Sequence, residues 1–325
     1  MKGAPPTVQK RDGAQQAAAG GVAEHLSGLS AFSASLRLSF REEDTMPKKM
    51  IHDFQRMKQA GDKITWLTAY DFPIAQFAEA AGLDMLLVGD SLGMCVYGYP
   101  NTIPVTMDQC IVHCEAVRRG APNTFIIGDM PFMSYQSSVE KAVENAGRFL
   151  KQANVDAIKL EGGRRILPMV RAILDAGIVV VGHIGLTPQS SGQLGGHKAQ
   201  GRTVESAKAL IDDANALADA GIQMLLLEAI PPEVGKHITE KLAIPVLSIG
   251  AGMHCDGQLL IVSDMIGQFQ AFTPKFVKKY CNVAEVVTEA MKQYVADVRS
   301  GRFPTDEHCY HMLEGEYEKF ERMVG

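Results

Sequence analysis

Five short apolar runs in the sequence each end in charged or titratable side chains. Most of these side chains are carboxylates, with a lysine in one run and a histidine in another. The runs are MLLVGD (85–90), FIIGDM (125–130), AIKLEG (157–162), VVVGHIG (179–185) and MLLLEA (224–229), and their polar residues are Asp90, Asp129, Lys159, Glu161, His183 and Glu228. Burying a charge is costly unless it is paired or binds a ligand. One such residue could simply cap a loop, but five successive runs indicate a shared functional site.

The residue types favour metal-assisted chemistry. Carboxylates without clustered cysteine or histidine suit a hard cation with oxygen ligands, and Mg²⁺ is the natural choice. Lys159 lies two residues before Glu161, so both side chains point to the same side of an extended strand. The lysine could then hold a substrate carboxylate or an enolate oxygen as a point charge.

The strands that must position these residues alternate regularly with helices along the sequence. Three further apolar runs, ITWLTAY (64–70), PVLSIGAG (245–252) and LLIVSD (259–264), bring the number of predicted strands to eight. Amphipathic helical patterns such as MDQCIVHCEAVRRG and SVEKAVENAGRFLKQA lie between most of the runs. Continuous apolar strands indicate burial on both faces, hence parallel strands covered by helices. The pattern predicts an α/β fold, a (β/α)8 TIM barrel whose strands open onto one face; a doubly wound open sheet is the alternative.

The composition is that of an ordinary globular protein. The 325 residues are 46% hydrophobic and 21% charged, with a net charge of -5. This balance argues against a disordered chain and against nucleic acid as a partner, and no apolar run approaches the roughly 18 residues of a membrane helix. Six cysteines without a CxxC pair favour reduced thiols in a cytoplasmic protein. Cys110 and Cys114 could bind a metal with His113, but their segment is more typical of an amphipathic helix.

The two ends differ from the middle. Residues 1–45 are rich in Ala, Gly, Gln and Ser, and they lack the apolar stretch of a secretory signal. We interpret them as a disordered extension, with Met46 as an alternative translation start. The catalytic barrel is expected over residues 46–311, followed by a polar C-terminal tail over residues 312–325.

A family resemblance covers the predicted barrel from about residue 47 to about residue 311. Its most specific motifs are GDSLGM, IKLEGG and GHIGLTPQS in this order, supported by TAYDF, GDMPFMSY, LLLEAIP, IPVLSIGAG and DGQLLIVSDMIG. Together they resemble the ketopantoate hydroxymethyltransferase family. Two departures stand out: His197 occupies a position where Tyr is expected, and Ser248 one where Ile is usual.

The resemblance implies a fold and a reaction. The fold would be a Mg²⁺-dependent barrel of the phosphoenolpyruvate mutase/isocitrate lyase superfamily type, usually assembled as a homodecamer. The reaction would transfer a hydroxymethyl group from 5,10-methylenetetrahydrofolate to 3-methyl-2-oxobutanoate through a Mg-stabilised enolate. The products would be 2-dehydropantoate and tetrahydrofolate, at the first step of the pantothenate branch leading to coenzyme A. The expected partners are thus the small-molecule 2-oxo acid and the folate, with neither nucleic acid nor a membrane.

Residue roles also follow from the matched motifs. The resemblance implies Asp90, Asp129 and Glu161 as metal ligands and Glu228 as the catalytic proton acceptor. Substrate contacts are implied for Asp90, Ser91, Asp129, Lys159 and His183, where His183 could equally bond a neighbouring carbonyl.

Two competing hypotheses remain for the predicted barrel. A Mg²⁺-dependent 2-oxo acid lyase or phosphonopyruvate-type mutase would use the same carboxylates, but such lyases usually carry a KxCGH loop that this sequence lacks. A non-catalytic binding protein gains nothing from clustered buried charge.

Overall fold

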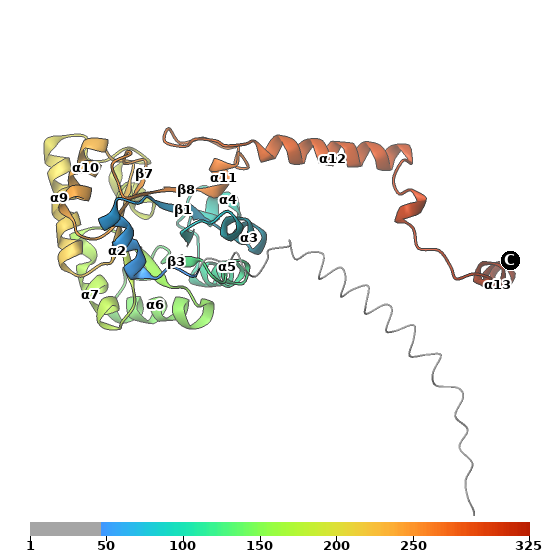
Figure 1. Ribbon diagram of the computed structural model, residues 1–325, viewed down its shortest axis with the longest axis horizontal. Helices are drawn as coiled ribbons and strands as arrows, with labels where there is room; N and C mark the ends of the chain where they lie inside the picture. Colours follow the sequence, from blue (N-terminus) through green and yellow to red (C-terminus); the bar gives the residue numbers. More distant parts are fainter. Residues whose placement is uncertain (1–46) are drawn as a thin grey trace, which may run out of the picture. The chain divides into compact units, whose positions relative to one another are not determined.

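Eight parallel strands hydrogen-bond in chain order and close into a barrel (Figure 1). The structure is a computed structural model that describes residues 47–325; the predicted disordered extension and the alternative start at Met46 lie outside the described residues. The closed order confirms the (β/α)8 barrel and excludes the open doubly wound sheet. The strands are β1 (Ile64–Thr68), β2 (Met85–Val88), β3 (Phe125–Asp129), β4 (Ala157–Glu161), β5 (Val180–Gly185), β6 (Met224–Glu228), β7 (Val246–Ile249) and β8 (Gly257–Leu260).

Helices follow most strands, as the periodicity predicts. They are α2 (Ile51–Ala60), α3 (Phe72–Ala80), α4 (Leu92–Cys95), α5 (Met107–Gly120), α6 (Val139–Ala153), α7 (Leu167–Asp175), α8 (Ser191–Leu194), α9 (Val204–Asp219), α10 (Pro232–Lys241), α11 (Val262–Met265), α12 (Val283–Ser300) and α13 (Glu316–Val324). The strand predicted over residues 259–264 is wrong at its end, because the chain leaves β8 at Leu260 and turns into α11. Asp264 therefore lies on a short helix rather than on a strand.

The strands separate two apolar layers, because successive side chains of a strand point to opposite faces. The inner layer fills the barrel and includes Trp66, Phe125, Leu226 and Leu247. Phe54 of α2 packs edge-on against Phe125, with ring centroids 5.1 Å apart, and belongs to this inner layer. Polar side chains in the same inward-facing rows therefore lie above a dry, packed floor.

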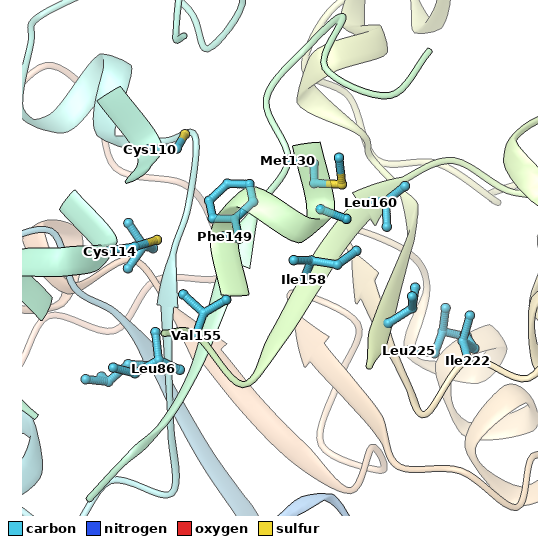
Figure 2. Close-up of a cluster of buried hydrophobic side chains, with 14 of the residues drawn as sticks. Leu86, Cys110, Cys114, Met130, Phe149, Val155, Ile158, Leu160, Ile222 and Leu225 are labelled. Atoms are coloured by element: carbon cyan, nitrogen blue, oxygen red, sulfur yellow. The ribbon is translucent and has the colours of Figure 1, made fainter. Parts of the chain in front are cut away.

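The outer layer lies between the strands and the surrounding helices (Figure 2). In α6, Ser138 caps the first turn and the buried residues recur at helical spacing, ending with Phe149 and Ala153. Phe149 contacts β3 closely at Gly128, where a Cβ atom would lie 2.6 Å from its ring. Cys110 and Cys114 of α5 are buried in the same apolar cluster. Their burial confirms the interpretation of this segment as an ordinary amphipathic helix.

Helix α12 differs from the helices that cover the strands. None of its residues is buried, although its sequence repeats apolar side chains. The exposed set comprises Val286, Val287, Met291, Tyr294, Val295 and Val298. Within residues 47–325, every helix is too short or too polar to cross a bilayer.

We predict that residues 1–45 are dispensable for folding, because every barrel strand and helix in the described residues 47–325 begins after residue 50. A chain that begins at Met46 should have the same melting temperature as the full chain, measured by circular dichroism. A fall of more than about 4 °C, or roughly 1 kcal/mol or more at this size, would instead show that the segment stabilises the barrel.

Candidate active site

The predicted site residues continue the inward-facing rows of the strands. Asp129 follows Phe125 and Ile127 on the same side of β3, and both of these belong to the inner layer. The same alternation places the other strand residues inward, namely Lys159 and Glu161 after Ala157, His183 after Val181, and Glu228 after Leu226. Together with Asp90 and Ser91 they line one cavity of about 880 Å³. All seven predicted residues thus meet at one end of the barrel.

The Lys159 ammonium group lies at the centre of this cluster. Its Nζ is 2.8 Å from Asp129 Oδ1, 3.5 Å from Glu161 Oε1 and 3.3 Å from His183 Nδ1. Strand register accounts for the grouping, because Asp129 pairs with Lys159 and Glu161 pairs with His183 across neighbouring parallel strands. Each of these four residues is at most 2% exposed. The cluster is therefore a desolvated array of charges rather than a surface network.

Burial and mutual repulsion determine the pKa values of the acids. Burial, followed by the charges of Asp129 and Glu161, raises the pKa of Asp90 well above its ordinary value. Burial also raises the pKa of Asp129, against the lowering effect of Lys159. Although burial favours neutral Glu161, Lys159 and then His183 hold its pKa below the ordinary value. Burial disfavours charged Lys159, but Asp129, Glu161 and Asp90 together raise its pKa. Lys159 thus offsets the effect of burial for Glu161 but not for Asp90 and Asp129.

His183 connects this cluster to Glu228. Its Nδ1 is 3.5 Å from Glu161 Oε1, and its Nε2 is 3.2 Å from Glu228 Oε2. Burial and Lys159 lower the pKa of His183, but the nearby carboxylates of Glu161 and Glu228 outweigh both and raise it to about 9. The Nε2 atom is buried without hydrogen-bond geometry to any partner among the described residues. The histidine thus lies between two acids, rather than on a neighbouring carbonyl.

The backbone fixes Glu228 at the end of β6. Its carbonyl accepts a hydrogen bond from the Leu186 N–H at 2.9 Å, and the Ala229 N–H donates to the Ile249 carbonyl at 2.9 Å. Ala229 has φ = 46°, in the left-handed region that favours glycine. Gly185 cannot be larger, because a Cβ atom there would lie 2.2 Å from the Glu228 carbonyl oxygen. The Glu228 side chain, 14% exposed, is the most accessible acid in the described part of the cluster.

Asp90 and Ser91 lie just beyond β2, on a turn that leads into α4. The Asp90 N–H donates to Asp129 Oδ2 at 3.0 Å, so the turn is joined to the end of β3. The Ser91 and Tyr70 hydroxyls are 2.8 Å apart. Asp90 and Ser91 both line the cavity beside the charged cluster.

Sequence reasoning missed Gln189 and Tyr135, which hold the acids in place. The Gln189 side chain donates to Asp90 Oδ2 at 3.0 Å and to the Met130 carbonyl at 2.9 Å, and its N–H donates to Glu161 Oε2 at 3.0 Å. The Tyr135 hydroxyl accepts from the Glu161 N–H and is 3.0 Å from Gln189 Oε1. Both residues occur in recognised motifs, GHIGLTPQS and GDMPFMSY, but as uncharged loop residues they gave no signal of their own.

The donor chemistry of the cluster fits a hard divalent cation. Asp129 Oδ1 is buried and receives no hydrogen bond of good geometry, although the Lys159 ammonium lies beside it. Burial and the neighbouring acids raise the pKa values of Asp90 and Asp129, so a bound cation would favour their charged forms. Among residues 47–325, no group of three or more His, Cys, Asp or Glu side chains is already arranged around a metal position. In this structure the Lys159 ammonium group lies against Asp129 and Glu161 instead.

Solved structures of other proteins share the barrel fold of this chain. Phosphonopyruvate hydrolase, crystallised with oxalate and Mg²⁺, aligns over 86% of this chain and 97% of its own, with a TM-score of 0.54 and 13% identity. 2,3-Dimethylmalate lyase, a PEP mutase/isocitrate lyase superfamily member, covers 85% of this chain and 99% of its own, with a TM-score of 0.50 and 17% identity. These structures thus share the (β/α)8 barrel fold of this chain.

Sequence similarity then identifies the family. The sequence pattern of ketopantoate hydroxymethyltransferase matches residues 48–306. A 3-methyl-2-oxobutanoate hydroxymethyltransferase of Alkaliphilus metalliredigens is 65% identical over 276 residues, covering 85% of this chain and 97% of the relative. The enzyme of the same name from Syntrophomonas wolfei is 51% identical over 257 residues, covering 79% and 93%. The chain belongs to the ketopantoate hydroxymethyltransferase family.

We predict that Gln189→Leu destabilises the protein, because it leaves Asp90 Oδ2 and the Met130 carbonyl without their buried donor. An unsatisfied buried group costs about 1–3 kcal/mol, so the free energy of unfolding in urea should fall by at least that amount. Gln59→Leu, at an exposed position of α2, is the matched control and should change little. Equal stability of the two variants would show that the Gln189 amide does not support the cluster.

Proposed function

We propose that this chain transfers a hydroxymethyl group from 5,10-methylenetetrahydrofolate to 3-methyl-2-oxobutanoate, with one water supplying the hydroxyl oxygen, giving 2-dehydropantoate and tetrahydrofolate. Family membership and the names of the relatives support this reaction. The observation that carries it is the buried cluster of Asp90, Asp129 and Glu161 around Lys159, with Glu228 beyond His183. The reaction would be the first step of pantothenate formation, with the 2-oxo acid and the folate as small-molecule partners.

Asp90, Asp129 and Glu161 are the residues that would hold Mg²⁺. Their oxygens are the ligands this cation prefers, and one buried oxygen of Asp129 lacks a hydrogen bond. When bound, the cation would polarise the keto group of the 2-oxo acid and acidify its C3 proton. The added positive charge would also offset the repulsion that raises the pKa values of Asp90 and Asp129.

The remaining residues would bind the substrate and move its proton. Lys159 provides a fixed positive charge for the substrate carboxylate or for the oxygen of the enolate. Ser91, fixed by Tyr70, offers a hydroxyl beside Asp90. Glu228 is the accessible acid and accepts the C3 proton at its carboxylate. His183, 3.2 Å from that carboxylate, acts as its positioning residue. Water opens the methylene bridge of the folate, so that tetrahydrofolate leaves and a one-carbon unit at the formaldehyde level is released. The enolate carbon attacks this unit, and the oxygen of the unit takes up the proton held by Glu228 to become the new hydroxyl.

Product analysis tests this function against its competitors. The chain is incubated with 3-methyl-2-oxobutanoate, 5,10-methylenetetrahydrofolate and Mg²⁺, and the products are identified by mass spectrometry. The proposal requires 2-dehydropantoate and tetrahydrofolate in equal amounts. Folate-independent cleavage of a larger 2-oxo acid would indicate a lyase, and binding without turnover would indicate a binding protein; either result alone contradicts the proposal.

We also propose that the chain acts as a cytoplasmic homo-oligomer, for which the family suggests a decamer. The apolar side chains of α12 support assembly, since they are exposed in the single chain. The six free thiols fit a reducing compartment. The division into an extension over residues 1–45, a barrel over 46–311 and a tail over 312–325 belongs to the same proposal.

We predict that Asp129→Asn weakens the Mg²⁺ dependence of turnover, because it removes one charge from the proposed ligand set while keeping the side-chain shape. The Mg²⁺ concentration for half-maximal activity should rise by at least the roughly 10–100-fold seen for residues that only support metal ligands. Asp108→Asn, at an exposed position of α5, is the control. Undiminished wild-type turnover in excess chelator would contradict the metal site.

We predict that Glu228→Gln lowers kcat by about 10²–10⁴-fold, the usual contribution of a general acid–base group. Glutamine keeps the shape of the side chain but cannot accept the C3 proton. Mg²⁺ affinity, measured by calorimetry in the same variant, should stay nearly constant. Unchanged turnover would exclude proton transfer by Glu228, whereas lost Mg²⁺ binding would place it among the ligands.

A further inference from the structure

The cavity is much larger than a small 2-oxo acid requires. Its volume of about 880 Å³ lies near the upper end of the range of about 300–1,000 Å³ that is typical for sites of larger ligands. Beyond the charged cluster, it is lined by α11 and by the loop over residues 266–282, which follows that helix. The proposed mechanism assigns no role to the side chains of this second part.

Asp264 of α11 is an unusual side chain in this second part. The residue lines the cavity but is only 5% exposed. Among residues 47–325, no group donates a hydrogen bond to its carboxylate or forms an ion pair with it; burial raises its pKa to about 6, and only Lys279 acts in the opposite direction. Unlike Asp129 Oδ1, its carboxylate oxygens are not fully enclosed and so face the open space of the cavity, where no protein group of the described residues pairs with them. Its chemistry therefore calls for a ligand that brings N–H donors.

The walls near Asp264 are aromatic, and the loop that forms them is fixed to α11. Phe269 and Phe272 pack edge-on with centroids 5.5 Å apart, and both line the cavity. Phe276 lies on Gly250, where a Cβ atom would be 2.6 Å from its ring. The Phe269 N–H donates to the Ser263 carbonyl at 3.0 Å, which anchors the start of the loop. These side chains offer flat apolar surfaces beside the buried acid.

Positive charge lines the exposed part of the same cavity. Arg202 and Lys275 are both exposed and line it, as does His197. The second part of the cavity thus combines a buried acceptor of hydrogen bonds, aromatic walls and exposed cations. A ligand complementary to it would carry N–H donors, a flat ring system and an anionic tail.

We propose that Asp264 binds the amino-pyrimidinone edge of the folate co-substrate, with the aromatic loop against its rings and Arg202 and Lys275 near its glutamate tail. This inference rests on the proposed function. The pyrimidinone ring presents a ring N–H and an exocyclic amino group side by side. A carboxylate accepts such a pair in parallel, as a bidentate interaction. The 2-oxo acid would occupy the charged cluster in the same cavity.

Calorimetric titration with tetrahydrofolate, at pH 8 where Asp264 is ionised, tests the assignment. Asp264→Asn should raise the Kd by roughly 10–100-fold, as expected for loss of a hydrogen-bonded charge. The KM for 3-methyl-2-oxobutanoate should change less than about twofold, since the cluster around Lys159 is untouched. Asp264→Ser should show the same loss, and Asp219→Asn, at an exposed position of α9, should bind as the wild type does.

A second ligand distinguishes a direct contact between Asp264 and the amino-pyrimidinone edge from an indirect effect of the substitutions on binding. A tetrahydrofolate analogue with a methyl group in place of the exocyclic amino group should bind the wild type weakly and Asp264→Asn no more weakly. Equal affinity of wild type and both Asp264 variants for intact tetrahydrofolate would overturn the assignment while leaving the reaction intact. If the wild type neither binds tetrahydrofolate nor forms 2-dehydropantoate, the proposed function fails, and this inference fails with it.

Discussion

The site depends on one constraint: three carboxylates and a lysine are removed from water at one end of the barrel. Isolated charges in such a place would neutralise or unfold the structure. Lys159 prevents this by lying 2.8 Å from Asp129 and 3.5 Å from Glu161. The ammonium group does not offset the burial of all three acids, because burial and then the charges of Asp129 and Glu161 keep the pKa of Asp90 raised. A cation bound beside these acids would favour their charged forms.

The barrel supplies the rigidity that this constraint requires. Inward-facing side chains such as Phe125, Leu226 and Trp66 form a dry floor, so the charged residues above them cannot withdraw into the interior. Parallel register sets the lateral spacing, since Asp129 pairs with Lys159 and Glu161 pairs with His183. The orientation of the acids depends on neutral residues instead. Gln189 and Tyr135 bind both the side chains and the backbone around them. Strand geometry thus selects the positions, while loop residues orient the groups.

The sequence predicts the strands and the polar residues on them well, because both follow from the spacing and burial of apolar side chains alone. Apolar runs located all eight strands, and a charged residue within such a run marked Asp129, Lys159, Glu161, His183 and Glu228. Gln189 was not predictable in this way, since its role depends on a loop returning to Asp90, 99 residues earlier in the chain. Asp264 was misplaced on a strand because LLIVSD is apolar to its last residues, although the chain turns into α11 after Leu260. The exposure of α12 could not be predicted from the sequence either, since its apolar residues repeat as they do in a helix that covers the strands.

In the proposed reaction, the different origins of the two parts of the cavity would keep the two substrates apart. The charged cluster lies on β3 to β6, whose side chains are held by register and have little freedom. The second part lies on α11 and on a loop anchored to it by backbone hydrogen bonds, such as that from Phe269 to Ser263. Loops tolerate substitution more readily than strands do, so the second part can be shaped without disturbing the acids. A reaction that joins a small anion to a large heterocycle benefits from this separation, because the reacting carbon needs accurate placement whereas the rings mainly need a complementary surface.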